Sequence, residues 1–239
     1  MTAPTPPRRA RNAPEQYDDL ADAWWDAQGP FAALHWLAAA RAELLPAPSG
    51  PGATLVDLGC GGGLMAPHVP EGFRHVGVDR NAAALEQAAT RGIETVLGDV
   101  TAVPLPDGCA EVVVAGELIE HVDDLPGLVA EIARLLAPGG AVVYDTINQT
   151  FWAKLSLVWV GERLPGGPPR NIHDPRLFVA PARLAALLGA HGLVVEEQFG
   201  LQVHAPSYLR FLRDRSAAVH MQRVRSLAAL YAGRARAPS

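Results

Sequence analysis

Residues 54–65, TLVDLGCGGGLM, decide the fold of this chain. The first half is an apolar run of the kind that forms a buried strand, and the second half is a cluster of glycines. Because glycine has no Cβ, such a cluster allows tight turns and lets a ligand approach the backbone closely. The stretch therefore predicts a strand, a tight turn and a ligand that lies against the turn.

The spacing of these glycines discriminates between nucleotide ligands. A dinucleotide-binding turn has a third glycine three residues after the second, but Leu64 holds that position here. The next apolar run, 75–78, ends in Asp79, a carboxylate placed to accept hydrogen bonds from two ribose hydroxyls. The sequence thus predicts a ribose-containing ligand other than NAD.

The motif Asp57-x-Gly-x-Gly-Gly-Gly together with Asp79 resembles the cofactor signature of class I methyltransferases, which use S-adenosylmethionine. Apolar runs and helical patterns alternate downstream, as they do in α/β proteins with a parallel sheet. The expected fold is therefore α/β, the Rossmann-like three-layer sandwich of class I methyltransferases. Strands are expected at 55–58, 75–78, 95–97, 112–115, 141–146 and 193–197, and helices near 82–90, 125–136 and 181–191.

The chain is long enough for one domain with a full hydrophobic core. It has 239 residues, of which 49% are hydrophobic and 19% charged. We expect disordered tails at 1–13, which is basic, and at 233–239. Between them we expect one methyltransferase domain, 14–232, with a helical cap at 14–45, an insertion after the fifth strand at 147–179 and a basic C-terminal helix at 207–232.

Charge and cysteine content exclude several classes of function. The net charge is −5, yet residues 207–239 carry seven arginines against one aspartate, so most of the remaining surface repels phosphate and nucleic acid is not an expected partner. The two cysteines, Cys60 and Cys109, lack metal-ligand spacing and indicate a reducing compartment. No apolar stretch approaches the roughly 20 residues that span a bilayer, and the N-terminus has no apolar signal region. We expect a cytoplasmic protein, with a peripheral contact on the inner face of the membrane left open.

A second informative stretch, GELIEHV at 116–122, follows the predicted fourth strand. If it forms a helical turn, Glu117, Glu120 and His121 stand at i, i+3 and i+4 and share one face. Two carboxylates and an imidazole suit a divalent metal ion. The alternative is that they are solvated residues at the start of a helix, where the helix dipole favours carboxylates.

Asp99 and Val100 follow the predicted third strand. The carboxylate of Asp99 is placed to accept the amino group of an adenine, and Val100 to offer its backbone amide to the same base. A turn-forming aspartate is the alternative reading.

The chain resembles the 3-demethylubiquinol O-methyltransferase family over roughly residues 14–206. The matching segments are Trp24-Trp25-Asp26 with Phe31 and Leu34-His35, the glycine motif, Glu117-x-x-Glu-His-Val, Asp145-Thr-Ile-Asn, His173-Asp174, Phe178 and Pro181. The resemblance implies transfer of a methyl group to a hydroxyl of a catechol or hydroxyquinol, prenylated or not. It also implies magnesium ligands at Glu117, Glu120 and His121, and S-adenosylmethionine contacts at Arg41, Gly59, Asp79 and Gly116. We expect Asp57, Gly61 and Arg80 to bind the cofactor as well.

The acceptor hydroxyl must lose its proton, because a phenol with a pKa near ~10 is mostly protonated at neutral pH. A metal ion at Glu117, Glu120 and His121 would lower the pKa of a chelated catechol. Alternatively His121 or His173 is the general base, although the pair His173-Asp174 is also compatible with a simple loop turn. We therefore expect Glu117, His121 and His173 to be catalytic.

Two questions stay open. Residues 151–165 are aromatic and apolar with nearby cations, so they either rest on a membrane surface or form a lid over the pocket. The Ala/Arg/Pro-rich composition also fits a natural-product O-, N- or C-methyltransferase without a metal. A module that binds S-adenosylmethionine without catalysis is the alternative from another class.

Overall fold

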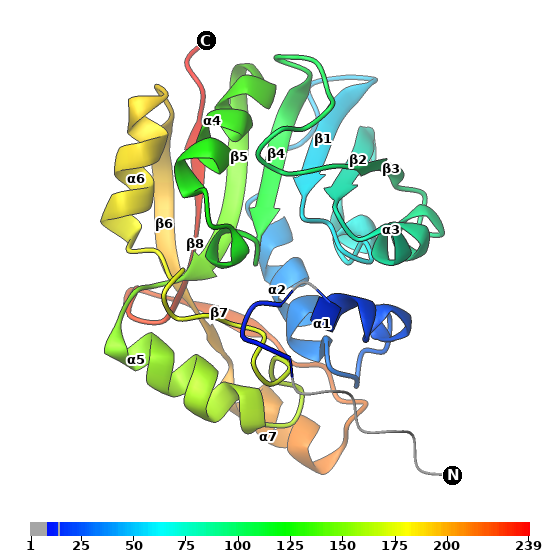
Figure 1. The fold of residues 1–239 in the computed structure, drawn as a ribbon, viewed down its shortest axis with the longest axis vertical. Helices are drawn as coiled ribbons and strands as arrows, with labels where there is room; N and C mark the ends of the chain where they lie inside the picture. The colour runs from blue at the N-terminus through cyan, green and yellow to red at the C-terminus, as the bar shows by residue number, and fades with distance from the viewer. Residues whose placement is uncertain (1–8, 14) are drawn as a thin grey trace.

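One eight-stranded sheet organises the computed structural model, which describes residues 9–13 and 15–239 (Figure 1). The strand order is β3-β2-β1-β4-β5-β8-β6-β7. The first five strands are parallel to one another, and β8 runs antiparallel to both of its neighbours. The bounds are β1 Ala53–Leu58, β2 Phe73–Asp79, β3 Glu94–Leu97, β4 Ala110–Gly116, β5 Leu136–Ile147, β6 Val194–Val203, β7 Met221–Val224 and β8 Leu230–Arg236.

Helices cover both faces of this sheet. α4 (Leu125–Leu135) and α6 (Pro181–Ala190) pack on one face, while α2 (Ala32–Ala42) and α3 (Ala82–Ala89) pack on the other. Because both faces are covered, the central strands are apolar on both sides, which is why they appear in the sequence as short continuous apolar runs. The predicted three-layer α/β sandwich is confirmed, and all six predicted strands are present.

The C-terminal region differs from the prediction of one basic helix over 207–232. The structure has a shorter helix, α7 (Ala205–Arg213), followed by strands β7 and β8. In β8 the arginines Arg234 and Arg236 alternate with buried Tyr231 and Ala235, and both arginines bond Glu196 of β6. This period of two defines a strand, and pairing with β5 and β6 also orders residues that we expected in a tail.

The N-terminal segment forms the cap over the sheet. α1 (Glu15–Asp18), a 3₁₀ turn (Ala21–Ala23) and α2 follow one another below the carboxyl ends of the parallel strands in Figure 1. Of the tail expected at 1–13, residues 1–8 lie outside the described residues. Residues 9–13 are not a free tail, because Arg11 bonds the carbonyl of His173 and Asn12 bonds His121.

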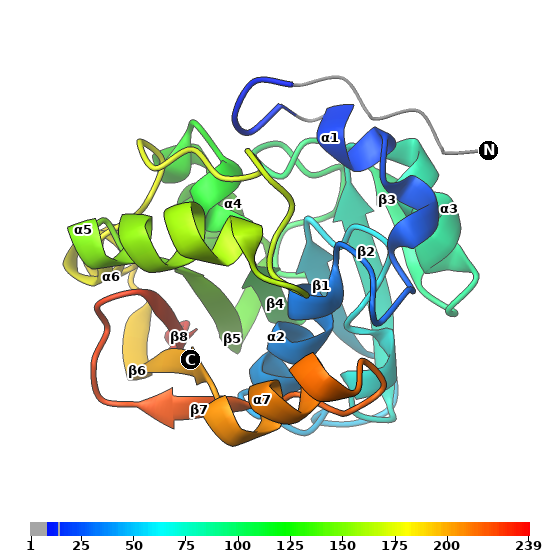
Figure 2. The same ribbon diagram turned by 90° about the horizontal axis from the view of Figure 1, so that it is seen from below.

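The insertion after β5 is helical. α5 (Phe151–Ala153) continues as a π-helical segment (Lys154–Val160) and a 3₁₀ turn (Gly161–Arg163). Seen from below, α5 lies on one side of the visible ends of β4 and β5, and α2 and α7 lie on the other (Figure 2). Tyr208 of α7 donates a hydrogen bond to the carbonyl of Pro165 (2.9 Å), and Trp36 of α2 packs edge to face on Phe211 of α7. Among the described residues, no helix has the length and hydropathy needed to cross a bilayer.

Candidate active site

A cavity of about 830 Å³ lies between the carboxyl ends of the parallel strands, the cap and the insertion. In open α/β sheets ligands bind at this edge. The cavity brings together all of the residues that the sequence predicted to contact the cofactor: Arg41, Asp57, Gly59, Gly61, Asp79, Arg80, Asp99, Val100 and Gly116. Glu117, His121 and His173 line the same cavity.

Asp79 stands at the end of β2 with its carboxylate fixed by two backbone amides. Oδ2 accepts from the amide of Gly61 (2.9 Å) and Oδ1 from the amide of Asn81 (2.8 Å). Burial raises the pKa of Asp79, although these hydrogen bonds oppose the shift. The carboxylate is thereby held in place beside the glycine turn before any ligand binds.

The indole of Trp24 lies against the glycine turn. A Cβ on Gly61 or Gly62 would overlap Trp24 ring atoms, and Gly61 also has a positive φ of 50°. Trp25 donates from Nε1 to the carbonyl of Gly62 (2.9 Å), and Trp24 stacks on Phe31 with ring centroids 4.2 Å apart. Gly61 and Gly62 are therefore needed for the cap to pack against the turn. From the sequence we had expected the glycines to make room only for a ligand.

A buried ion pair joins the cap to the sheet. Arg41 of α2 donates from Nε and Nη2 to the two carboxylate oxygens of Asp145 at the end of β5 (2.7 and 2.9 Å). Burial disfavours the charged guanidinium, but the interaction with Asp145 more than offsets this and the pKa of Arg41 is raised. Asp145 also accepts from the amide of Glu117 (2.8 Å), so it positions the chain that leaves β4.

Glu117, Glu120 and His121 do not share one helical face. Only Ile119–His121 forms a 3₁₀ turn, and Glu117 precedes it with a φ of 49°, which turns its side chain away from the direction that a regular helix would give. Glu120 is fully buried, accepts a hydrogen bond from Thr146 Oγ1 (2.7 Å) and does not line the cavity. The predicted face is therefore wrong in its geometry.

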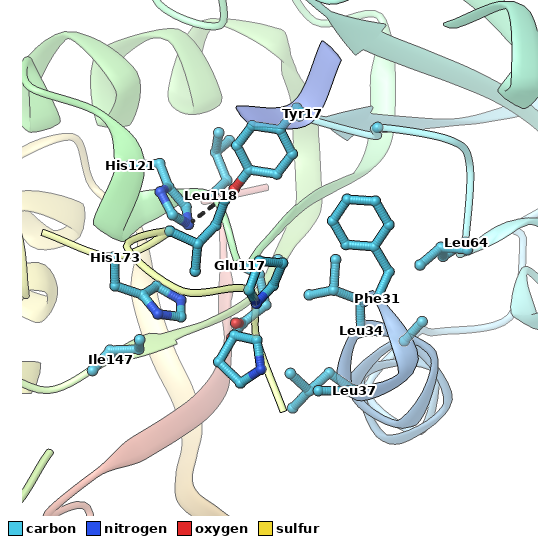
Figure 3. Close-up of a pocket in the computed structure, with 18 of the residues that line it drawn as sticks. Tyr17, Phe31, Leu34, Leu37, Leu64, Glu117, Leu118, His121, Ile147 and His173 are labelled. Carbon is cyan, nitrogen blue, oxygen red and sulfur yellow. Dashed lines mark hydrogen bonds between the residues drawn. The ribbon is translucent and has the colours of Figure 1, made fainter. Parts of the chain in front are cut away.

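The structure instead brings His173 to Glu120 and His121. One ligand atom from each of these three side chains lies within 4.8 Å of the others, the only such group of metal-ligand type found among the described residues. The two imidazoles stack with centroids 5.4 Å apart, and Figure 3 shows them side by side at one end of the cavity. His173 is buried, and its Nδ1 has no hydrogen-bond partner among the described residues.

Burial strongly shifts the protonation of this cluster. It raises the pKa of Glu117 well above its ordinary range, with the nearby carboxylates of Glu120 and Asp145 adding to the shift, and it raises the pKa of Glu120 to about 7. Burial, together with nearby His173 and Arg80, lowers the pKa of His121 to about 3. In the absence of a bound cation His121 is thus neutral at physiological pH, and its lowered pKa makes it a weaker base than a free imidazole.

Asp99 lines the cavity next to Val100, but its carboxylate already has local partners. It accepts from the backbone amide and the hydroxyl of Thr101 (2.8 and 2.7 Å), and these bonds lower its pKa. One oxygen, Oδ1, makes both bonds, so Oδ2 is left for a ligand.

Three residues of the site were missed by the sequence analysis. Tyr17 lines the cavity with its hydroxyl 3.4 Å from His121 Nε2 (Figure 3). Asn12 bonds the other ring nitrogen of His121, and Glu162 lies 3.8 Å from His173 Nδ1. Tyr17 falls within the helical cap expected at 14–45, but nothing in the local sequence marks Tyr17, Asn12 or Glu162 as residues of the site.

The part of the cavity beyond the histidines is lined by apolar side chains. They come from the cap, β5, the insertion and the C-terminal strands, and include Leu34, Leu37, Ile147, Leu157, Leu164, Val203, Met221 and Leu230. Tyr208 of α7 also lines the cavity. The cavity thus has a polar half at the glycine turn and an apolar arm.

Comparisons with known proteins agree with this geometry. A family model described as a methyltransferase domain matches residues 56–144. The ubiquinone biosynthesis O-methyltransferase of Aeromonas salmonicida is 31% identical over 216 residues, covering 86% of this chain and 90% of that protein. The protein of the same name from a Methylobacterium species is 31% identical over 240 residues, covering 92% and 96%.

Solved structures share the fold. An S-adenosylmethionine-dependent methyltransferase from Thermotoga maritima aligns with a TM-score of 0.64 at 21% identity, covering 93% of this chain and 96% of that one. An N-methyltransferase from Bradyrhizobium japonicum, solved with S-adenosyl-L-homocysteine, aligns with a TM-score of 0.60 at 14% identity, covering 94% and 98%. The sheet order, the cofactor-type cavity and curated relatives that match nearly end to end lead to one conclusion: this chain is an S-adenosylmethionine-dependent methyltransferase and belongs to the ubiquinone biosynthesis O-methyltransferase family.

Proposed function

We propose that the chain transfers the methyl group of S-adenosylmethionine to a hydroxyl of a catechol or hydroxyquinol that carries a hydrocarbon chain, as a step in quinone biosynthesis. The observation that carries the proposal is the single cavity in which the predicted cofactor residues, the His121 and His173 pair and an apolar arm meet. Family membership favours an enzyme over a binding module without catalysis.

The polar half of the cavity suits the cofactor. Asp79 would accept hydrogen bonds from the ribose hydroxyls, and Asp99 with Val100 would hold the adenine. Arg41 would pair with the cofactor's carboxylate through Nη1, which makes no hydrogen bond to the described residues. When bound, S-adenosylmethionine supplies an electrophilic methyl group.

The other end suits a hydroxyl that must lose its proton. His121, or His173 beside it, would take the proton as the bond from oxygen to the methyl carbon forms. Glu117 lines the cavity with an Oε1 that has no hydrogen-bond partner among the described residues, so it would bond and orient the acceptor.

The cluster of Glu120, His121 and His173 also fits a divalent ion such as magnesium. Glu120 Oε1 is buried and has no hydrogen-bond partner in the described part of the chain, so it could bind a cation, and one ring nitrogen each of His121 and His173 belongs to the same group. These three residues would hold the ion, with His173 in place of the Glu117 that the sequence predicted. A bound ion would lower the pKa of a chelated hydroxyl.

The apolar arm argues for an acceptor with a hydrocarbon tail. Its lining includes the apolar side chains of Leu157, Leu164, Val203 and Met221. An acceptor with its ring at His121 would extend a hydrocarbon tail among them. Burial of each CH₂ contributes about 0.8 kcal/mol, so tail length should strongly affect the KM.

A turnover assay tests the proposal. The protein would be incubated with methyl-labelled S-adenosylmethionine and a panel of catechols and hydroxyquinols with and without alkyl or prenyl tails, and products would be identified by mass spectrometry. We expect O-methylated products and a lower KM for tailed acceptors. Products methylated only on nitrogen or carbon would contradict the O-methyl assignment.

The same assay with a chelator tests the metal. If the ion takes part, chelation abolishes turnover and added magnesium restores it. Calorimetric titration with magnesium gives a second readout, since Glu120→Gln should lose the binding that Asp107→Asn, an exposed carboxylate elsewhere, retains. Full turnover under chelation would favour His121 or His173 acting as the base alone.

We also propose that the insertion meets a lipid surface. Exposed apolar side chains gather on α5 and the residues that follow it, with Phe151 70% and Trp152 and Trp159 each 56% exposed, and α7 adds Leu209 at 54%. Cations of the same segments are Lys154, Arg163, Arg210 and Arg213. Aromatic side chains with flanking cations bind at membrane interfaces, where a tailed acceptor would also be found.

A further inference from the structure

The side chain of Asn12 contacts His121 at two points. Oδ1 lies 2.5 Å from His121 Nδ1, and Nδ2 donates to the backbone carbonyl of His121 (3.2 Å). Asn12 does not line the cavity and lies behind the imidazole. It therefore acts on the site only through His121.

The two contacts together determine which atom faces which. A backbone carbonyl only accepts hydrogen bonds, so the NH₂ of the Asn12 amide must face it, and the amide oxygen must then face His121 Nδ1. An amide oxygen also only accepts, so Nδ1 must carry a proton. In the neutral imidazole Nε2 then keeps its lone pair, on the side of Tyr17 and the cavity (Figure 3).

Asn12 is itself held by a network of bonds to the loop that carries His173. We call residues 9–13 and 15–17 the N-terminal strap. The Asn12 amide donates to the carbonyl of Asn171 (3.1 Å), Gln16 Nε2 donates to the same carbonyl (3.1 Å), and Arg11 donates to the carbonyl of His173 (2.8 Å). With a φ of 57°, Asn12 adopts a left-handed conformation that asparagine tolerates better than most residues.

We propose that Asn12 is a positioning residue for the methyl transfer, which holds His121 in the tautomer with the proton on Nδ1 and so keeps Nε2 available to the acceptor. The inference rests on the proposed function, in which His121 acts at the acceptor hydroxyl. It assigns the strap a part in the chemistry, although none of its residues needs to touch the acceptor for this purpose.

The test compares Asn12→Gly and Asn12→Asp in the full chain. Glycine removes the side chain and accepts the positive φ, whereas aspartate keeps an acceptor oxygen at Nδ1. Ring-nitrogen NMR with ¹⁵N-labelled histidine, with His121 assigned by the signal lost in His121→Gln, reports the tautomer. Asp19→Asn is the control, because it breaks the partly exposed pair with Arg9 on the same strap.

We expect the Nδ1–H tautomer in the wild type, a shift toward Nε2–H in Asn12→Gly, and retention of Nδ1–H in Asn12→Asp. Turnover number should fall about tenfold in Asn12→Gly with little change in the KM for S-adenosylmethionine, and recover in part in Asn12→Asp. A wild-type His121 in the Nε2–H form, or an Asn12→Gly variant with unchanged tautomer or turnover number, would overturn the inference. If the wild type methylates no catechol or hydroxyquinol, the proposed function fails instead, while the NMR result still decides the tautomer.

Discussion

The guanidinium of Arg41 and the carboxylate of Asp145 form a two-point ion pair in which both side chains are buried. Arg41 comes from the cap and Asp145 from the end of β5, so the pair links the cap to the sheet across the cavity wall. The same carboxylate bonds the amide of Glu117. Disturbing the pair should therefore affect both the stability and the shape of the site.

Removing one partner of this pair should be strongly destabilising. Asp145→Ala leaves a buried guanidinium without a counter-charge, and we expect the free energy of unfolding to fall by about 3–5 kcal/mol in urea denaturation. Arg74→Gln, which breaks the exposed pair with Glu94, is the matched control and should leave the midpoint near that of the wild type. Equal midpoints for the two variants would contradict a stabilising role for the Arg41 pair.

Gly116→Ala should disturb the same pair from the other side. A Cβ at this position would overlap the guanidinium of Arg41 and would force it away from Asp145. We expect a loss of about 1–3 kcal/mol in the free energy of unfolding. Because both changes act on Arg41, the Gly116→Ala/Asp145→Ala double variant should lose less than the sum of the single losses. Strict additivity would show that Gly116 acts elsewhere.

Asp79→Asn should weaken binding of the cofactor. The ribose would lose a charged acceptor, and hydrogen bonds to charged groups contribute about 1.5–3 kcal/mol, so the Kd for S-adenosylhomocysteine should rise roughly 10- to 150-fold in calorimetric titration. Glu86→Gln, an exposed change on the helix that follows, serves as the control. An unchanged Kd in a folded Asp79→Asn protein would remove Asp79 from the cofactor site.

The first half of the sheet, and the meeting of the expected cofactor residues at one cavity, could be predicted from the sequence. Each parallel strand is a short apolar run that ends at turn residues, and Asp79 follows such a run directly. The place of these residues in the fold therefore follows from their immediate neighbours in the sequence. The arrangement of Glu117, Glu120 and His121 could not be predicted in this way. Glu117 has a positive φ, which changes the direction of its side chain, and nothing in the neighbouring sequence indicates this backbone conformation.

Long-range pairing explains the other differences. β8 is a strand because β5 and β6 lie on either side of it, and its arginines find Glu196 only in the folded sheet. Asn12 reaches His121 across more than a hundred residues of sequence, and Glu162 approaches His173 from a separate turn. No spacing rule connects such residues before the fold is known.

The stability of the β6 and β8 pairing should depend on pH through Glu196. Its hydrogen bonds to Arg236, and then to Arg234, lower its pKa below the ordinary value of 4.5. Between the lowered value and 4.5 the unfolded chain binds more protons, so this contribution to stability is complete above 4.5 and is lost as the pH falls through the folded pKa. Glu196→Gln should therefore show a shallower loss of urea midpoint below pH 4.5. A profile as steep as that of the wild type would contradict this role.

Replacing Trp152 and Trp159 by Ser should reduce binding to lipid vesicles. Both indoles are more than half exposed, and burying one apolar side chain contributes about 1.5–3 kcal/mol, so we expect at least about a tenfold weaker partition in flotation with vesicles of anionic and zwitterionic lipid. Val194→Ser is the control, since Val194 is 68% exposed but lies on β6 away from the insertion. If the wild type does not float with vesicles, the insertion closes the pocket instead.

The place of β8 in the sheet sets an order of events during synthesis. Residues 230–236 follow every other strand in the sequence, yet they lie between β5 and β6. A nascent chain can assemble β1 to β5 early, but β6 and β7 cannot join that sheet until residues 230–236 have left the ribosome. The apolar arm of the cavity, lined in part by Val203, Met221 and Leu230, is thus completed last. A premature stop just before β8 should leave the glycine turn and its surrounding strands able to form without the complete apolar arm of the cavity.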